Sequence, residues 1–435
     1  MNILDYLEKE FSSFERKPFN VVDSAILSQF CMVRCEGLVP PFNPDTLNTS
    51  SSQSIGSIGL IKRLGTFFKK PEQTEMPLPA QFSNLLRAER YAEMFTGLVP
   101  DRIKATLVAL AASPRFRRLG LLDYLSIFDK ESNNQFAALT FVHGNKDSHN
   151  EFAYIGFRGT DTSLTGWREN FNMAYTSPVP AQAQALHYLE TVAGHLPKRL
   201  YVGGHSKGGN LALYAALKAN PEIQSRIETV FAHDAPGFKE GAITPDEWKR
   251  LEGKINRTIP QESIVGMLMN CPITAHVVQA QEHGFDQHSI FNWDVSLEAS
   301  NFVYAGTLSD SSQFFNEVFS EWLARYSDEQ AAQIVDALFK AIEVSGISNA
   351  SELFFGGIKT IPLLTKAAQN LDNESGTVLR SALGSLAAIA ANHAGANVSK
   401  NMQEFGRGVS ENLQDASRNV QEFFSSKFSR EQKQW

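Results

Sequence analysis

One serine in the chain lies between two glycines, where an apolar run meets a helix-like segment. The five residues are Gly204-His205-Ser206-Lys207-Gly208. Residues 199–203 before them have the composition of a buried strand, and residues 210–217 after them have that of a helix. A nucleophilic serine on such a strand-to-helix turn adopts a strained backbone, and the residues two before and two after it must lack bulk. Gly204 and Gly208 meet this requirement, so the pattern predicts a nucleophile at Ser206.

A serine hydroxyl is a weak nucleophile alone, so a base and an orienting acid should follow it along the chain. An apparent strand at 228–232 runs directly into the turn His233-Asp234-Ala235-Pro236. Asp234 is therefore predicted to lie at the carboxyl end of a strand, where sites gather in open α/β sheets, and is the predicted acid. Two alternatives stay open. In the first, Asp234 only caps the turn and has no catalytic role. In the second, the acid is Glu262, which follows an apparent strand at 254–259.

Four histidines follow Asp234, namely His276, His283, His288 and His393. The pattern predicts that His276 is packed within an apolar strand and that His393 lies in a helical segment. His283 and His288 flank a loop between apparent strands, which is where a base must lie to reach Ser206. The predicted base is His288, with His283 in reserve. A metal site built from this pair with Asp286 is the weaker alternative, and we expect no cofactor.

A tetrahedral oxyanion would need two N–H donors beside the nucleophile. The backbone N–H of Lys207 is the first predicted donor, because it directly follows Ser206. The second is predicted in the segment Phe157-Arg158-Gly159-Thr160-Asp161, where a strand ends at a small residue. Here the backbone of Thr160, and also its hydroxyl, are the candidate donors.

The composition excludes several classes of protein. With 435 residues, 43% of them hydrophobic, the chain can bury a large core without disulfides or structural metals. Its net charge of -7 argues against nucleic-acid binding, which requires a concentrated positive field. Three cysteines suit neither a disulfide framework nor a zinc site. The first residues lack the pattern of a signal peptide, and no apolar run approaches the ~20 residues of a membrane span, so we expect a cytoplasmic protein.

Strand-like and helix-like runs alternate between residues 120 and 300, which predicts an α/β fold with a mostly parallel central sheet. The expected strands are 122–128, 136–142, 152–157, 200–203, 229–232, 273–280 and 290–295. The expected domain organisation is an N-terminal helical segment at 1–40 packed on the core, a flexible insert at 41–80, the core at 81–305, an all-helical extension at 306–395, and an amphipathic helical tail at 396–435.

Two segments outside the core could contact partners. Residues 60–70, in the insert, are amphipathic and basic, which suits a lid or a membrane-surface contact, or a loop tucked onto the body. In the tail, residues 396–430 carry an apolar stripe at helical spacing. Docking on the protein itself or self-association explains that stripe better than membrane binding does.

Several of these stretches together resemble a known family. They are Phe157-Arg158-Gly159-Thr160-Asp161, Gly166-Trp167-Arg168-Glu169-Asn170-Phe171, Gly204-His205-Ser206-Lys207-Gly208-Gly209-Asn210, Asp234-Ala235-Pro236-Gly237-Phe238 and Gln287-His288-Ser289-Ile290-Phe291-Asn292-Trp293. From residue 2 to about 383 the chain resembles the Mbeg-like bacterial family of lipase-related α/β-hydrolases, and more remotely the class-three lipases. The resemblance implies an α/β-hydrolase fold and a serine acyl-enzyme mechanism.

The chain departs from the class-three lipases at two positions. Those lipases tend to have an apolar residue after the serine, where this chain has Lys207. They also have an aspartate before an Ile-Val-Pro stretch, where this chain has Glu262-Ser263-Ile264-Val265. The acid therefore stays open between Asp234 and Glu262.

The leading hypothesis is the hydrolysis of a small-molecule or lipid carboxylic ester by an esterase or lipase-like enzyme, with Ser206 as nucleophile, His288 as base and Asp234 as acid. A thioesterase or amidase using the same triad is an alternative. Another alternative belongs to a different class of protein. It is a hydrolase-shaped interaction or membrane-associated protein with vestigial activity, in which the insert and the tail recruit a partner.

Overall fold

The core of the protein is one seven-stranded sheet whose strands follow chain order. A computed structural model of the chain describes residues 1–44, 78–95, 97–144, 150–345, 367–368 and 371–393. The strands are β1 (Gly120–Asp129), β2 (Asn134–His143), β3 (Phe152–Phe157), β4 (Leu200–His205), β5 (Ile227–His233), β6 (Ile255–Pro260) and β7 (His276–Val278). The first three pair antiparallel, and β3 to β7 are all parallel. The predicted α/β fold with a mostly parallel sheet is confirmed.

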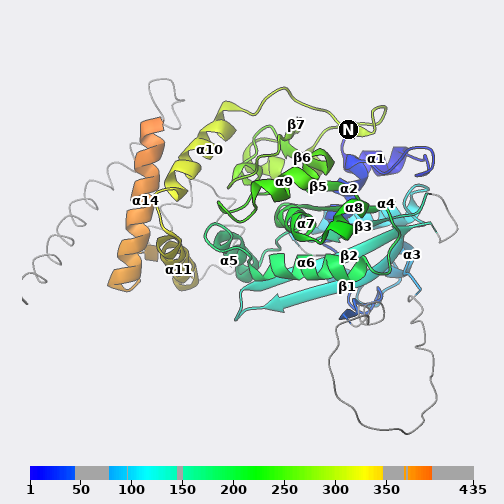
Figure 1. Cartoon of the computed structure of the whole chain (residues 1–435), viewed down its shortest axis with the longest axis horizontal. Helices are drawn as coiled ribbons and strands as arrows, with labels where there is room; N and C mark the ends of the chain where they lie inside the picture. The colour runs from blue at the N-terminus through cyan, green and yellow to red at the C-terminus, as the bar shows by residue number, and fades with distance from the viewer. Residues whose placement is uncertain (45–77, 96, 145–149, 346–366, 369–370, 394–435) are drawn as a thin grey trace, which may run out of the picture.

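Helices cover both faces of this sheet (Figure 1). The helices α1 (Ile3–Lys9), α2 (Val21–Phe30) and α4 (Pro100–Ala112) pack on one face, and α6 (Pro180–Val192) and α7 (Lys207–Lys218) on the other. Alternate residues of one strand serve the two layers: Tyr154 faces the first group, whereas Ala153 and Ile155 face the second. The apolar run of β3 is thus explained, because a strand buried on both faces needs no polar alternation.

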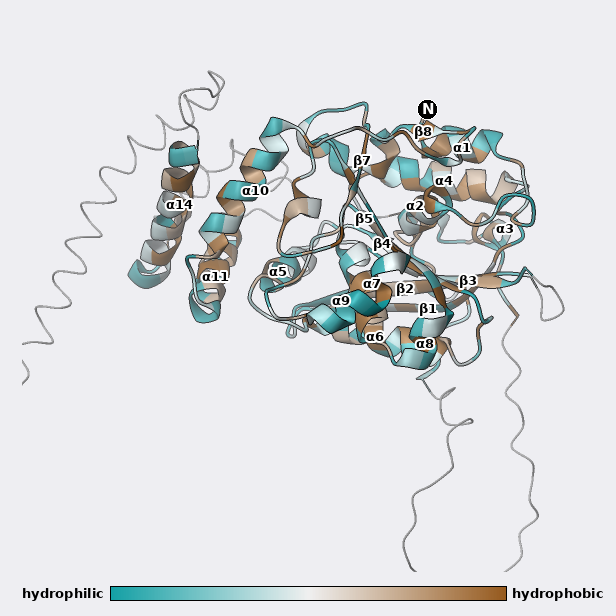
Figure 2. Ribbon diagram, turned by 45° about the horizontal axis from the view of Figure 1, so that its top comes forward, coloured by the Kyte–Doolittle hydropathy of each residue, from teal (hydrophilic) through white to brown (hydrophobic). Residues whose placement is uncertain are grey.

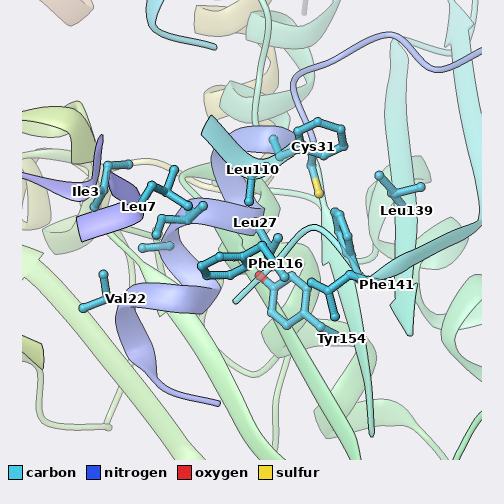
Figure 3. Packing of buried hydrophobic residues seen from close by; sticks show 14 of the residues in the cluster. Ile3, Leu7, Val22, Leu27, Cys31, Leu110, Phe116, Leu139, Phe141 and Tyr154 are labelled. Atoms are coloured by element: carbon cyan, nitrogen blue, oxygen red, sulfur yellow. The ribbon is translucent and has the colours of Figure 1, made fainter. Parts of the chain in front are cut away.

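The helices of the first face bury a continuous apolar layer. Figure 3 shows how side chains from α1, α2 and α4 meet Leu139, Phe141 and Tyr154 of the sheet. In Figure 2 the central strands are mostly brown, whereas α9 (Pro245–Leu251) on the outside is mostly teal. Asn20 and Asp23 form a capping box that starts α2. The expected helical character of this N-terminal region therefore has a local cause at residue 20.

A buried ion pair also fixes the N-terminal region to the core. Arg115 donates to both carboxylate oxygens of Asp23, at 2.9 and 2.5 Å, and neither side chain is exposed. The other guanidinium N–H groups bond to backbone carbonyls of Ser12, Lys17 and Pro18. Every donor that points into the protein thus has an acceptor, which is the condition under which a buried charge is tolerated.

One expected strand is wrong, and another is shorter than expected. Residues 290–295 form a 3-10 turn (Ile290–Asn292) and only begin a two-residue strand at Val295. Trp293 is fully buried and donates its indole N–H to the carbonyl of Gln287 at 2.7 Å. Residues 290–295 are mostly apolar because they pack into the core. Their composition therefore resembles that of a buried strand. The strand expected at 273–280 is limited to His276–Val278.

The described residues after the sheet domain form the helices α10 (Asp310–Leu323), α11 (Asp328–Ser345) and α14 (Asn373–His393). They lie together at one side of the sheet domain, and α11 packs against α5 (Leu164–Asn172) (Figure 1). Most of the insert, including residues 60–70, and the tail from 394 lie outside the described residues. The five-part division of the chain stays a prediction. None of the described helices is long and apolar enough to cross a bilayer.

The Asp23–Arg115 pair predicts a measurable loss of stability when it is broken. We expect Asp23→Asn to lower the free energy of unfolding by about 3 to 5 kcal/mol, because it leaves a buried guanidinium without its counter-charge. Urea unfolding monitored by circular dichroism measures this change. Glu321→Gln is the control, since Glu321 forms an exposed pair with Arg325 and should change the midpoint little. Equal midpoints for the two variants would contradict the assigned role of Asp23.

Candidate active site

Ser206 occupies a sharp turn between β4, which ends at His205, and α7, which begins at Lys207. Its backbone angles are φ 58° and ψ -129°, in a region that L-residues rarely adopt. A hydrogen bond of 2.9 Å from the Ser206 N–H to the carbonyl of His233 joins this turn to the end of β5. The strained turn expected from the sequence is therefore present, and Ser206 is partly exposed at its tip.

The two glycines are required by close backbone approaches. A Cβ atom on Gly204 would lie 2.3 Å from the carbonyl carbon of Gly208, and one on Gly208 would lie 2.2 Å from the carbonyl oxygen of Phe157. Both distances are far below any van der Waals contact. We call the turn at residues 204–208 the elbow. The elbow, α7 and the end of β3 pack together only because Gly204 and Gly208 have no side chain.

Asp234 and His288 lie side by side at the carboxyl edge of the sheet. The Nδ1 of His288 is 2.6 Å from the Oδ2 of Asp234, a carboxylate that is fully buried directly after β5. A carboxylate accepts, so Nδ1 carries the proton in this hydrogen bond. The neutral ring then has its free electron pair on Nε2, which is the tautomer that a general base for a serine requires.

The second oxygen of Asp234 is also held. Its Oδ1 accepts from the hydroxyl of Ser263 at 2.5 Å and from the N–H of Gly266 at 3.0 Å. Ser263 is itself buried, and its carbonyl accepts from the hydroxyl of Ser312 near the start of α10. Two donors besides His288 thus fix the orientation of the carboxylate, and through it that of the His288 ring.

His205 also contacts His288. Its Nε2–H donates to the backbone carbonyl of His288 at 2.8 Å, and the centroids of the two rings are 4.5 Å apart. Burial lowers the pKa of His205 well below its ordinary value, and the neighbouring His288 adds to this effect. His205 is therefore a neutral donor that holds the His288 backbone against the elbow.

Within the described residues, the Ser206 hydroxyl and the Nε2 of His288 are not hydrogen-bonded to each other. The side chain of His288 is 12% exposed. Catalytic hydrogen bonds are often long in unliganded structures and shorten when the substrate binds. His288 is thus joined to the turn at Ser206 through His205, and its role as a base stays a prediction.

The two reserve candidates pair with each other at the surface. The Nδ1 of His283 lies 3.3 Å from Glu262, and the His283 side chain is 91% exposed. Glu262 also accepts from the N–H of Gly284 at 2.6 Å, and its own N–H donates to Gln287 at 2.8 Å. Glu262 therefore anchors the turn Gly284–His288 that carries the candidate base.

His276 lies in β7 as expected, but the prediction that it is packed is wrong. Its side chain is exposed and stacks on Tyr304, with 5.2 Å between the ring centroids. Its strand is the last of the seven-stranded sheet, and the side that alternation assigned to the core is exposed there. The other distal histidine, His393, ends α14 and pairs with Glu321.

The loop after β3 passes close to Ser206. A Cβ atom on Gly159 would lie 3.7 Å from the Cβ of Ser206. In the next residue, the hydroxyl of Thr160 is hydrogen-bonded to the side-chain amide of Asn170, with 2.7 Å between Oγ1 and Nδ2. The first N–H groups of a helix have no partner within it, and Lys207 is the first residue of α7. The segment 157–161 therefore lies beside Ser206, and the roles of Lys207 and Thr160 as donors stay predictions.

The side chain of Lys207 turns inward, a position that sequence reasoning missed. Its Nζ lies 2.5 Å from the carboxylate of Glu169 and 2.6 Å from the carbonyl of Gln135, and it is 1% exposed. Burial lowers the pKa of Lys207, and Glu169 opposes that shift. A charged residue directly after the serine was the available signal, together with Glu169 and Asn170 in the segment quoted for the family resemblance.

A surface hollow of about 570 Å³ lies away from these residues. Thr229 and Asn256, at the starts of β5 and β6, line it, so it is at the opposite end of the sheet from Ser206. In the part of the chain that the structure describes, no group of three or more His, Cys, Asp or Glu residues is arranged to hold a metal ion.

The helix-flanked sheet and the strand-to-helix turn at Ser206 define an α/β-hydrolase fold. The Mbeg1-like family model matches residues 110–340, more than half of the chain, and the protein belongs to that family. This confirms the resemblance seen in the sequence. No curated protein sequence matches the chain.

Two solved lipase structures are similar to the protein. One is the Rhizomucor miehei lipase propeptide complex, with 16% identity and a TM-score of 0.30 over 48% of this chain and 65% of the lipase chain. The other is M37 lipase, with 18% identity and a TM-score of 0.28 over 39% of this chain and 64% of that one. The protein thus spans less than two thirds of either lipase chain.

The close approach at Gly208 can be tested by adding one methyl group. We expect Gly208→Ala to lower the free energy of unfolding by at least about 3 kcal/mol, because the new Cβ would collide with the Phe157 carbonyl. Gly253→Ala is the matched control, since nothing lies within 4 Å of a Cβ built there. Thermal unfolding of both variants measures the difference, and a Gly208→Ala protein as stable as the control would disprove the packing described for the elbow.

Proposed function

We propose that the protein is a serine hydrolase that cleaves a carboxylic ester through an acyl-enzyme. The observation that carries this proposal is the 2.6 Å hydrogen bond between His288 and the buried Asp234, beside the strained backbone of Ser206. An aspartate, a histidine with its base nitrogen unoccupied, and a serine at an elbow are the three parts of a nucleophilic triad.

In the first half-reaction, the Oγ of Ser206 attacks the ester carbonyl while its proton moves to the Nε2 of His288. The Oδ2 of Asp234 stabilises the imidazolium that forms, through the Nδ1–H bond already present. The tetrahedral oxyanion accepts from the backbone N–H groups of Lys207 and Thr160, whereas the Thr160 hydroxyl donates to the Oδ1 of Asn170. The C–O bond to the alcohol then breaks, and the alcohol takes the proton from His288.

Water completes the cycle. It attacks the acyl-enzyme carbonyl, and His288 accepts one of its protons. Collapse of this second tetrahedral intermediate breaks the bond to the Ser206 oxygen, which recovers its proton from His288. The products are a carboxylic acid and an alcohol, and no cofactor is required.

Asp234 is favoured over Glu262 as the acid because of their different partners. Asp234 is fully buried and contacts His288, whereas Glu262 contacts the exposed His283 and a backbone N–H of the loop. A buried carboxylate with fixed donors holds an imidazole in one tautomer far better than a solvated one does. We therefore assign Glu262 to the support of the His288 loop.

A thioester or an amide would undergo the same steps. Assays with a panel of ester, thioester and amide substrates therefore identify the preferred leaving group. The alternative of an interaction protein with vestigial activity rests on the insert and the tail, which lie outside the described residues. It stays a prediction, as does the cytoplasmic location.

Labelling by a fluorophosphonate probe tests the nucleophile. We expect the folded protein to react at Ser206 with one probe per chain, because only an activated serine attacks phosphorus at a useful rate. We expect Ser206→Ala to abolish labelling and to lower the turnover of short-chain nitrophenyl esters by at least about 10³-fold. Mass spectrometry of the labelled peptide identifies the site. An unlabelled wild-type protein with a normal circular dichroism spectrum would overturn the proposal.

Two amide variants separate the candidate acids. We expect Asp234→Asn to lower kcat by about 10³- to 10⁴-fold, because an amide stabilises the wrong tautomer of His288 and not the imidazolium. Glu262→Gln retains the shape of the side chain and should lower kcat by less than about tenfold. Steady-state kinetics on a nitrophenyl ester measures both variants. The reverse order of effects would make Glu262 the acid.

A further inference from the structure

Lys207 opposes two physical preferences at the first position of α7. The start of a helix carries a partial positive charge, which disfavours a cation there. Its side chain is also 1% exposed, and an ammonium removed from water costs several kcal/mol unless it is paired. A residue that contradicts its local environment in this way is expected at a functional or strained position.

The ammonium of Lys207 has an acceptor for each of its three N–H bonds. These are the Oε2 of Glu169 at 2.5 Å, the carbonyl of Gln135 at 2.6 Å and the Oε1 of Gln135 at 3.2 Å. The side chain is therefore fully satisfied, and the cost of its burial is offset only in this one geometry. These bonds therefore restrain the first residue of α7.

Glu169 connects this ammonium to the surrounding elements. Its side chain is fully buried in α5, and it accepts from the N–H of Gln135 at 3.1 Å and from the N–H of Ala181 at 2.9 Å. Gln135 belongs to β2, and Ala181 lies in the first turn of α6. Backbone N–H groups of β2 and α6 thus hold the carboxylate of an α5 residue, and that carboxylate holds Lys207.

The next residue of α5, Asn170, contacts Thr160 on the other side of the elbow. Asn170 holds the hydroxyl of Thr160, so two consecutive side chains of α5 reach the residues that carry the two oxyanion donors. We propose that the Lys207–Glu169 ion pair is a positioning device of the oxyanion hole, which fixes the backbone N–H of Lys207 relative to Thr160. This inference rests on the proposed ester hydrolysis.

A positioning role has a kinetic signature that differs from that of simple structural support. Oxyanion donors act on the charge that develops in the transition state, so their displacement lowers kcat and leaves KM nearly unchanged. Loss of structural support instead lowers the fraction of folded protein, which an active-site titration counts directly. The two effects can therefore be separated in one preparation.

Glu169→Gln is the primary test, because it retains the shape of the side chain and removes its charge. We expect fluorophosphonate to label this variant to the same final stoichiometry as the wild type, at a rate about 10- to 100-fold lower. The value of kcat per labelled site should fall by a similar factor, with KM within about threefold of the wild type.

The double variant Lys207→Met/Glu169→Leu is the second test. Replacing both members of a buried ion pair by apolar residues often restores stability. We expect its melting temperature to stay below that of the wild type, because the N–H groups of Gln135 and Ala181 lose their acceptor, but to exceed that of a variant with one unpaired charge, while kcat per labelled site stays at least about tenfold lower. This variant decides the matter if Glu169→Gln is too unstable to isolate, since it leaves no unpaired charge.

Asp23→Asn is the matched control, because it breaks an equally buried ion pair on the opposite face of the sheet. It should lower the melting temperature and leave kcat per labelled site within about twofold of the wild type. The positioning role is disproved if Glu169→Gln retains wild-type kcat, if Asp23→Asn lowers kcat equally, or if the double variant regains full kcat. An unlabelled wild type would contradict the hydrolase itself, which is a different result.

Discussion

The arrangement of the site depends on the close contact of three backbone segments around Ser206. Gly204, Gly208 and the carbonyl of Phe157 approach so closely that no side chain fits between them. This contact presses the start of α7 against the end of β3, and it forces Ser206 into its unfavourable backbone angles. Such strain, of the order of 1 to 3 kcal/mol, persists only where the surrounding packing over-determines it. Here the two-sided burial of the central strands provides that packing.

The same contact explains why the proposed parts meet. When the end of β3 touches α7, the loop that carries Thr160 must pass beside Ser206. The parallel register of β4 and β5 places His205 opposite His233, so the residues that follow each strand, Ser206 and Asp234, leave the sheet together. His288, the proposed base, lies on a loop at the same edge of the sheet. Hydrogen bonds with Glu262 and Trp293 hold this loop in place. Sheet topology thus does most of the positioning, and side chains complete it.

The sequence predicted what local chemistry determines and failed where tertiary packing decides. The elbow could be predicted because its signal is local: the spaced glycines, the strand before them and the helix after them lie within about 20 residues. The pairing of Asp234 with His288 spans 54 positions, and chain order alone could only suggest it. The strand expected at 290–295 was wrong because apolar composition cannot distinguish a strand from a packed turn. The exposure of His276 was missed because alternation does not say which strand is at the edge.

Helix α5 links this chemistry to the C-terminal helices. It has only nine residues, too few to be stable alone, and its inner face carries the charge of Glu169. Its outer residues Trp167 and Phe171 pack with the cluster formed by α11 and α14, and Arg168 pairs with Asp336 of α11. Without that cover, the apolar outer side of α5 would face water, and the helix would lose part of what holds it in place. The helical extension therefore acts on the site through packing: it stabilises the one helix whose consecutive side chains hold Thr160 and Lys207.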